Sequence, residues 1–241
     1  EAPFSPRATG SSTAITTTPL AAKTATGSPS YNLPQQLTSF LGREQEIMHI
    51  HKLLQAGSSR LISLVGPGGI GKTRLALQVA NANQYLFAQG VCFVPLAGVQ
   101  SASAIPGAIM DALGASFAAG AGSPMRQLLQ VLSPQKMLII IDNFEHLMAG
   151  VDLLLAVLQA APHVTLLVTT REQLNCQAED TFRLEGLATP TQIAQDDAGQ
   201  YAAVRLFCER ANRLNKSFKL SAENCPAVVR ICQLVEGMPL A

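Results

Sequence analysis

Gly66-Pro67-Gly68-Gly69-Ile70-Gly71-Lys72-Thr73 matches the pattern GxxxxGK[ST] at every fixed position. Glycines let the backbone curl so that successive amide groups point at phosphate oxygens, and the start of a following helix adds its dipole. In this pattern the lysine reaches the β and γ phosphates, and the hydroxyl of the last residue ligates Mg²⁺. The stretch therefore predicts a phosphate-binding loop for a nucleotide.

The residues on either side of this loop provide the context that it requires. Residues 61–65 form a short apolar run that ends at a glycine, as expected of a buried parallel strand. Residues 71–83 place apolar side chains on one face of a helix. The sequence thus predicts a strand, the phosphate loop and a helix in succession.

The same alternation continues along the chain. Short apolar runs predict further strands, and segments of helical periodicity predict the helices between them. Ser123 with Pro124 after it is a typical helix start. This order indicates an α/β fold, a doubly wound parallel sheet that binds its ligand at the carboxyl ends of the strands. The predicted strands are residues 91–96, 137–141, 164–169 and 181–185, and the other predicted helices are residues 44–54, 102–113, a segment from Ser123 onward, and 151–160.

Changes in composition divide the chain into three parts. Residues 1–31 are rich in Ser, Thr, Ala and Pro, which predicts a disordered linker. Residues 32–190 carry the alternating pattern of the nucleotide-binding domain. Residues 191–241 show only helical periodicity and are interpreted as the truncated beginning of a small helical domain. Its two apolar stripes are Val204, Phe207, Ala211 and Leu214, and Val228, Ile231, Cys232 and Val235. Because the chain starts at Glu1 without Met, we interpret it as a piece of a longer protein.

Overall composition excludes several classes of function. The 241 residues have a net charge of +1 and only 14% charged residues, which argues against a protein that coats nucleic acid. No apolar run is long enough for a membrane span, and no secretory signal is present. The five scattered cysteines disfavour a zinc site or a disulfide framework and indicate free thiols in a cytoplasmic protein.

Four polar residues follow the predicted strands on the ligand-binding edge. Asp142 directly follows residues 137–141, where a P-loop protein needs a second Mg²⁺ ligand beside Thr73. Asn143 occupies the place where many hydrolysing relatives carry an acid, and Glu145 is the nearest substitute. Arg171 follows residues 164–169, where a cation can read the γ-phosphate.

Beyond the loop, four segments of the chain carry a wider resemblance. With the phosphate loop, they are similar in sequence and order to the STAND class of P-loop ATPases, which is AAA+-related and includes the NB-ARC domains of apoptosis and plant resistance proteins. The nearest likeness is to the bacterial branch found in large transcriptional regulators. The segments are residues 32–44 (NLPQQLTSFLGRE), 138–147 (LIIIDNFEHL), 167–172 (LVTTRE) and 237–241 (GMPLA).

The resemblance implies roles for residues outside the loop. Residues 40–44, which include Arg43, and the more distant Pro239 are expected around the base, and Arg171 is expected to sense the γ-phosphate. Arg74, directly after the loop, is included among the nucleotide contacts. In such proteins ADP holds a closed resting form, and exchange for ATP opens it, often toward oligomers.

Together these features predict an ATP/ADP-binding switch domain of a multidomain signal-transduction protein, a transcriptional regulator, with slow Mg²⁺-dependent ATP hydrolysis. The expected partners are the other domains of the parent chain, and nucleotide-dependent self-association is left open. Neither direct nucleic-acid binding nor membrane binding by this segment is expected. The residues expected to act in catalysis are Lys72, Asp142, Glu145 and Arg171, with Thr73 and Asp142 on the metal.

Two alternatives stay open. Because Asn143 replaces an acid, the domain could bind ATP or ADP for assembly without significant hydrolysis. A small-molecule kinase is a weaker alternative, since the sequence shows no acceptor pocket or basic lid. The basic residues of the C-terminal region are interpreted as a solvated helix face rather than a nucleic-acid strip, because Glu209 interrupts them.

Overall fold

The computed structural model describes residues 30–191 and 197–240, and the predicted linker therefore lies outside the description except for its last two residues. Within the described part, all strand pairs are parallel and form one sheet in the order β1-β3-β4-β5-β2-β6. The predicted α/β parallel fold is confirmed. The strands are β1 (Ser30–Tyr31), β2 (Leu61–Val65), β3 (Gly90–Pro95), β4 (Leu138–Asp142), β5 (Thr165–Thr170) and β6 (Glu179–Arg183).

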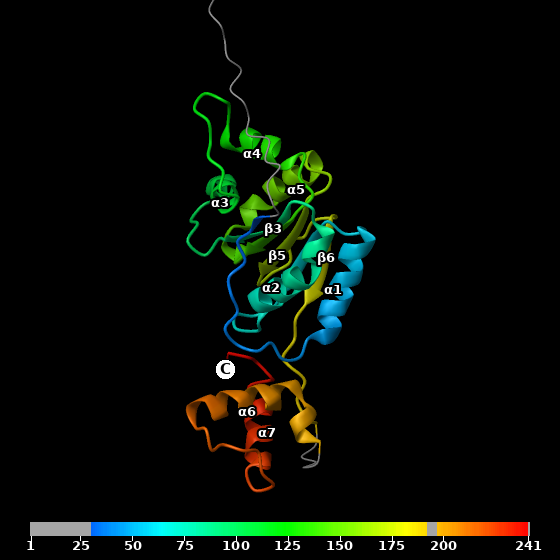
Figure 1. Cartoon of the computed structure of the whole chain (residues 1–241), viewed down its shortest axis with the longest axis vertical. Helices are drawn as coiled ribbons and strands as arrows, with labels where there is room; N and C mark the ends of the chain where they lie inside the picture. The colour runs from blue at the N-terminus through cyan, green and yellow to red at the C-terminus, as the bar shows by residue number, and fades with distance from the viewer. Residues whose placement is uncertain (1–29, 192–196, 241) are drawn as a thin grey trace, which may run out of the picture.

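Helices cover both faces of this sheet (Figure 1). Alternate residues of each strand point to opposite faces, so that Ile139 and Ile141 belong to one apolar core and Leu138 and Ile140 to the other. The first core also contains residues of α3 (Ile105–Ala112), α4 (Pro124–Leu132) and α5 (Val151–Ala160), and the second contains residues of α1 (Glu44–Ala56) and α2 (Lys72–Asn83). The sheet is thus buried on both faces, which explains its continuous apolar strands.

A smaller helical part follows the sheet and lies beyond its ligand-binding edge (Figure 1). It consists of a short turn η5 (Ala198–Gln200), α6 (Ala202–Leu214) and α7 (Cys225–Leu234). Its core contains Val204 and Val228 from the two predicted apolar stripes. Leu214, predicted at the end of the first stripe, is 92% exposed, and the stripe therefore ends earlier.

Several element boundaries differ from the sequence predictions by one to three residues, and three of these differences are informative. The last strand is Glu179–Arg183 instead of residues 181–185, because its pairing with β2 starts at Leu61↔Glu179. The first turn of the helix predicted at residues 102–113 is a 3₁₀ turn, Ala102–Ala104. Asp142 is the last residue of β4 rather than the residue after it. Ser123 does cap α4, since its hydroxyl accepts a hydrogen bond from the Arg126 amide.

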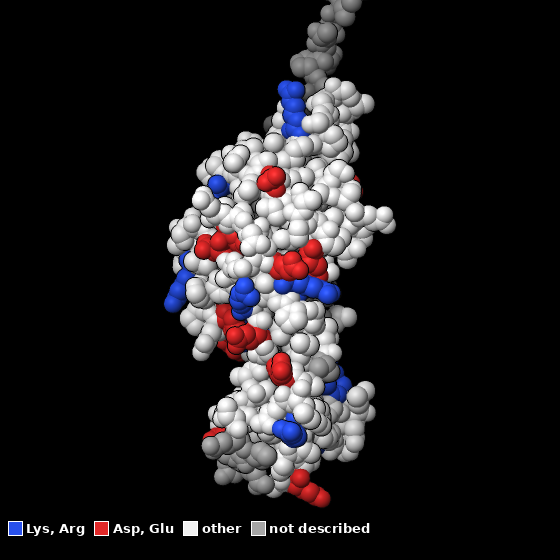
Figure 2. Space-filling model, turned by 180° about the vertical axis from the view of Figure 1, so that it is seen from behind, with Lys and Arg blue, Asp and Glu red and all other residues white. Residues whose placement is uncertain are grey.

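Charged side chains are sparse on the surface. Figure 2 shows Lys/Arg and Asp/Glu groups intermingled on one face, mainly around its middle, with broad uncharged areas between them. Among the helices of residues 30–191 and 197–240, none combines the length and the apolar run needed to cross a bilayer. All five cysteines are free thiols, as predicted, and burial raises the pKa of Cys92 to about 12.

Asn32 fastens the chain that enters the domain to the sheet edge. Its side-chain amide donates to the Phe93 carbonyl at 2.9 Å and accepts from the Phe93 amide at 2.6 Å. Asn32→Ala leaves the half-buried Phe93 amide without this partner, and we expect it to lower the free energy of unfolding by about 1–2 kcal/mol. Urea unfolding measures this loss, with Gln35→Ala on the same segment as control, and equal stabilities of the two variants would contradict it.

Candidate functional site

The phosphate loop lies between β2 and α2, at the carboxyl end of the strand next to the edge strand β6. Gly69 and Gly71 have positive φ angles of 81° and 97°, which L side chains rarely adopt. Gly71 is the N-cap of α2, so the helix begins at Lys72. The backbone thus curls in front of a helix N-terminus, an arrangement that binds anions.

Lys72 lies inside this curl. Its Nζ donates to the carbonyl oxygens of Gly66 at 2.7 Å and Pro67 at 3.0 Å. Burial lowers the pKa of Lys72; the nearby Arg171 lowers it further, while Glu145 and Asp142 raise it. The ammonium is therefore held at the loop, close to the other charged groups that the sequence predicted for the site.

Thr73 and Asp142 are 69 residues apart in sequence and meet at the N-terminal end of α2. The Thr73 hydroxyl donates to Asp142 Oδ1 at 2.7 Å. The hydroxyl of Thr169, in the neighbouring strand β5, donates to the same oxygen at 2.7 Å and accepts from the Asn143 amide at 3.0 Å. Thr169 fixes the carboxylate and was not predicted as part of the site; its place beside Arg171 at the end of a strand was the available signal.

The oxygen donors of this cluster suit a divalent cation. Mg²⁺ prefers hard oxygen ligands, usually one or two carboxylates or hydroxyls with waters and substrate phosphates completing its shell. The Thr73 hydroxyl and the Asp142 carboxylate are such donors at the edge of the phosphate loop. The residues present therefore fit the metal that the sequence predicted.

Glu145 and Arg171 face each other across the same edge. Arg171 Nε donates to Glu145 Oε1 at 3.0 Å, and the two side chains are 62% and 18% exposed, respectively. A Cβ placed on Gly68 would lie 3.5 Å from Arg171 Nη2, so the guanidinium extends over the phosphate loop. Asn143 has a left-handed backbone with φ 64°, which turns the chain after β4 into the short segment that carries Glu145.

Arg43 lies beside the loop, at the start of α1. Its guanidinium contacts Glu46, the Ile70 carbonyl and the Glu185 carbonyl, and the residue is 9% exposed. These contacts engage both terminal nitrogens of the guanidinium with groups of the protein itself. Arg43 thus joins the phosphate loop, through Ile70, to the chain that leaves β6.

Arg74 fastens the segment before α1 to the loop helix. Its guanidinium donates to the carbonyl oxygens of Thr38 at 3.0 Å and Ser39 at 2.8 Å, and it lies 5.8 Å from the centre of the Phe40 ring. The segment for which the resemblance implied contacts with the base is therefore held next to α2.

The C-terminal segment returns to the phosphate loop (Figure 1). A Cβ on Gly69 would lie 3.1 Å from the Leu240 Cβ, so Leu240 touches the loop. Pro239, the predicted contact with the base, lines an apolar groove between α6 and α7. The residue of this segment that reaches the loop is thus Leu240, which the sequence prediction did not include.

Two glycines allow the chain after α7 to approach the chain that leaves β6 closely. A Cβ on Gly186 would lie 1.7 Å from the Glu236 carbonyl oxygen, and one on Gly237 would lie 2.0 Å from the Leu187 carbonyl oxygen. The Leu187 amide donates to the Gly237 carbonyl at 2.9 Å. The chain leaving β6 and the chain after α7 are therefore in direct backbone contact.

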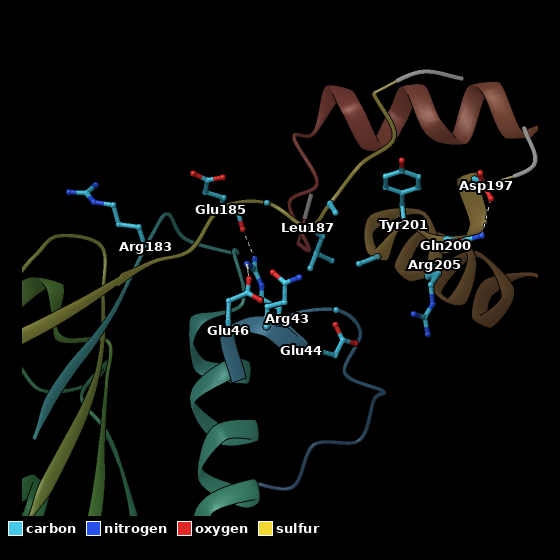
Figure 3. A pocket seen from close by; sticks show the side chains of 15 residues that line it. Arg43, Glu44, Glu46, Arg183, Glu185, Leu187, Asp197, Gln200, Tyr201 and Arg205 are labelled. Carbon is cyan, nitrogen blue, oxygen red and sulfur yellow. Dashed lines mark hydrogen bonds and ion pairs between the residues drawn. The ribbon is translucent and has the colours of Figure 1, made fainter. Parts of the chain in front are cut away.

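A cleft of about 790 Å³ opens beside this backbone contact. Figure 3 shows Arg43, Glu44 and Glu46 on one side, and Tyr201 and the end of η5 on the other. Residues 66–73 do not line it, and Arg43 is the link between the cleft and the loop. The phosphate-binding features and this cleft are therefore separate places on the molecule.

A parallel sheet with a glycine loop before a helix, and an Asp at the end of β4 that bonds the loop Thr although β5 lies between β4 and β2, defines a P-loop nucleoside triphosphatase fold. The family model described as "AAA ATPase domain" matches residues 39–216. This chain belongs to that family. The matched region includes the loop, Asp142 and Arg171, and excludes Pro239 and Leu240.

The curated relatives include proteins whose names describe transcriptional regulators. The chain is 36% identical over 184 residues to "Putative HTH-type transcriptional regulator Rv0890c" of Mycobacterium tuberculosis; the match covers 76% of this chain and 19% of the relative. It therefore spans about a fifth of the length of these regulators. A second M. tuberculosis protein, Rv0894, is 32% identical over 208 residues, which cover 86% of this chain and half of that protein.

The fold also matches a solved signalling ATPase. The crystal structure of a STAND protein with a tetratricopeptide repeat sensor, from Pyrococcus horikoshii, has a TM-score of 0.54 at 18% identity and covers 87% of this chain and 30% of that one. The P-loop ATPase domain predicted from the sequence is thus confirmed by the family match, and the fold and the relatives are consistent with the predicted STAND type.

Proposed function

We propose that this chain is the ATP/ADP-binding switch domain of a multidomain signal-transduction protein, a transcriptional regulator, and that it hydrolyses ATP slowly with Mg²⁺. The observation that carries the proposal is the bond from the Thr73 hydroxyl to Asp142 beside the phosphate loop. It joins the two oxygen donors that Mg²⁺ needs to the loop that receives the phosphates. The names of the relatives support the regulatory setting.

In this proposal each residue of the site has a separate task. The backbone amides of residues 68–71 and the Lys72 ammonium bind the phosphates, and Thr73 and Asp142 hold Mg²⁺, which neutralises charge on them. Arg171, over Gly68, reads the γ-phosphate that ATP has and ADP lacks. Glu145 is the carboxylate that orients the attacking water.

The contacts between the helical part and the nucleotide-binding part can transmit a change in bound nucleotide to other domains. Leu240 touches Gly69, and Gly237 bonds to Leu187, so the helical part contacts both the phosphate loop and the chain leaving β6. A nucleotide that changes the conformation of the loop therefore changes the surface that the helical part contacts. We infer that exchange of ADP for ATP changes how the helical part packs against the nucleotide-binding part. Neighbouring domains of the parent chain then respond to this change.

The second candidate is a nucleotide-dependent assembly module without significant hydrolysis. It is favoured by Asn143, which leaves the position after Asp142 without a carboxylate. Phosphate release from ATP distinguishes the two candidates. Turnover above the level of Lys72→Ala supports hydrolysis, and turnover equal to that level supports the assembly module.

Asp142→Asn tests the metal site within the proposed function. The variant keeps the shape of the side chain but removes the negative charge opposite Thr73, so we expect Mg²⁺-dependent phosphate release to fall about 100-fold. Asp152→Asn, at the start of α5 on the described chain, is the control for loss of one carboxylate. Turnover by Asp142→Asn equal to that of the control would exclude Asp142 as the metal ligand.

A further inference from the structure

The contact between Arg171 and Glu145 has a definite direction. Glu145 Oε1 accepts from Nε, the nitrogen within the side chain, at 3.0 Å. Nη2, at the far end, is the atom nearest to Gly68 of the phosphate loop. The bond to Glu145 therefore leaves the terminal nitrogens of the guanidinium free to meet a phosphate, because a guanidinium has five donors in a fixed planar arrangement.

Glu145 is held more firmly than the arginine that it contacts. Its side chain is 18% exposed, against 62% for Arg171, and it follows the fully buried Phe144 in the 3₁₀ turn η3 (Phe144–His146). An exposed arginine has many rotamers, and a fixed carboxylate on Nε selects among them. Glu145 is thus placed to act on the orientation of Arg171.

Other contacts of Arg171 do not account for this orientation. Within the described residues, the hydrogen bond and the ion pair found for its side chain both go to Glu145. Glu145 Oε2 is buried and has no hydrogen-bond partner there, so Arg171 is the one hydrogen-bond partner that the described residues provide for this carboxylate.

We propose that Glu145 is a positioning residue that aims Arg171 at the γ-phosphate and thereby sets the preference of the site for ATP over ADP. This inference rests on the proposed function, since it concerns the same nucleotide site. The chemistry recognised is a terminal phosphate dianion next to the loop at Gly68. A pre-oriented arginine binds it better than a free one, because less side-chain entropy is lost on binding.

The test is a double-mutant cycle on nucleotide affinity. Dissociation constants for ADP and for a hydrolysis-resistant ATP analogue, both with Mg²⁺, are measured for the parent, Glu145→Gln, Arg171→Ala and the double variant. We expect Glu145→Gln to weaken the ATP analogue relative to ADP about three- to fivefold more when Arg171 is present than when it is alanine. ADP affinity should stay within about twofold in all four proteins, which also shows that the variants fold.

The cycle separates positioning from simple charge. Removal of a carboxylate near the phosphates strengthens binding of the more highly charged ATP by itself, and the Arg171→Ala background measures that effect alone. Glu172→Gln, which removes the same charge from an exposed residue next to Arg171, is the matched control and should leave the ratio of the two affinities unchanged.

Each other result overturns the inference. An equal effect of Glu145→Gln in both backgrounds means that the contact does not orient Arg171. Tighter ATP binding specific to the Arg171 background means that Glu145 competes with the phosphate for the arginine. A parent chain that binds neither nucleotide overturns the proposed function together with this inference, whereas a parent that binds both without coupling overturns the inference alone.

Discussion

Lys72→Ala is expected to abolish Mg²⁺-dependent ATP turnover and to weaken ATP binding by at least about 100-fold. Lys72 is the one loop side chain that places a cation within the curl of residues 66–71, where it already bonds to the carbonyls of Gly66 and Pro67. A charged hydrogen bond to a phosphate in a partly desolvated place is among the strongest polar contacts in proteins.

The matched control is Lys52→Ala, which removes the same charge from the exposed face of α1. Phosphate release and displacement of a fluorescent nucleotide give the two readouts, and circular dichroism checks the fold. The account fails if Lys72→Ala keeps the turnover and the affinity of the control.

Gly186→Ala is expected to detach the segment after α7 from the sheet and to lower stability by about 3 kcal/mol. The added methyl would lie 1.7 Å from the Glu236 carbonyl oxygen, far inside contact distance, and the neighbour is backbone that cannot rotate away. Because Leu240 reaches Gly69 through this segment, ADP affinity should fall as well.

Gly98→Ala is the control, since a Cβ there meets nothing within 4 Å. Thermal unfolding gives the stability, and limited proteolysis of the chain between β6 and α6 gives the detachment. If Gly186→Ala had the same melting temperature and the same protease resistance as Gly98→Ala, the close backbone contact at Gly186 would not be what holds the helical part in place.

Most of the sheet could be predicted from sequence because its strands are buried on both faces. Residues 137–141 are a continuous apolar run, residues 61–65 are apolar except for Ser63, and that signal is local. β6 is a different case: its residues are partly exposed, and its limits depend on the register with β2, which no local pattern encodes. β1 is only two residues long, within a segment of linker-like composition, and was therefore missed.

The residues of the site likewise differ in whether the sequence alone predicts them. The loop, Asp142 and Arg171 are recognisable because their chemistry requires those residue types after strands. Thr169 and Leu240 gain their places only through tertiary contacts, one from the adjacent strand and one from the end of the described chain. The close approach at Gly186 was likewise invisible, since nothing in the sequence pairs it with Glu236.

The central claim is that the phosphate loop of this chain binds adenine nucleotide, and calorimetric titration tests it most directly. ADP with Mg²⁺ is titrated into the nucleotide-stripped chain and, in parallel, into Lys72→Ala. The account predicts saturable binding of one ADP per chain by the parent and its loss in the variant. Absence of binding to the parent, or the same isotherm for both proteins, would contradict it.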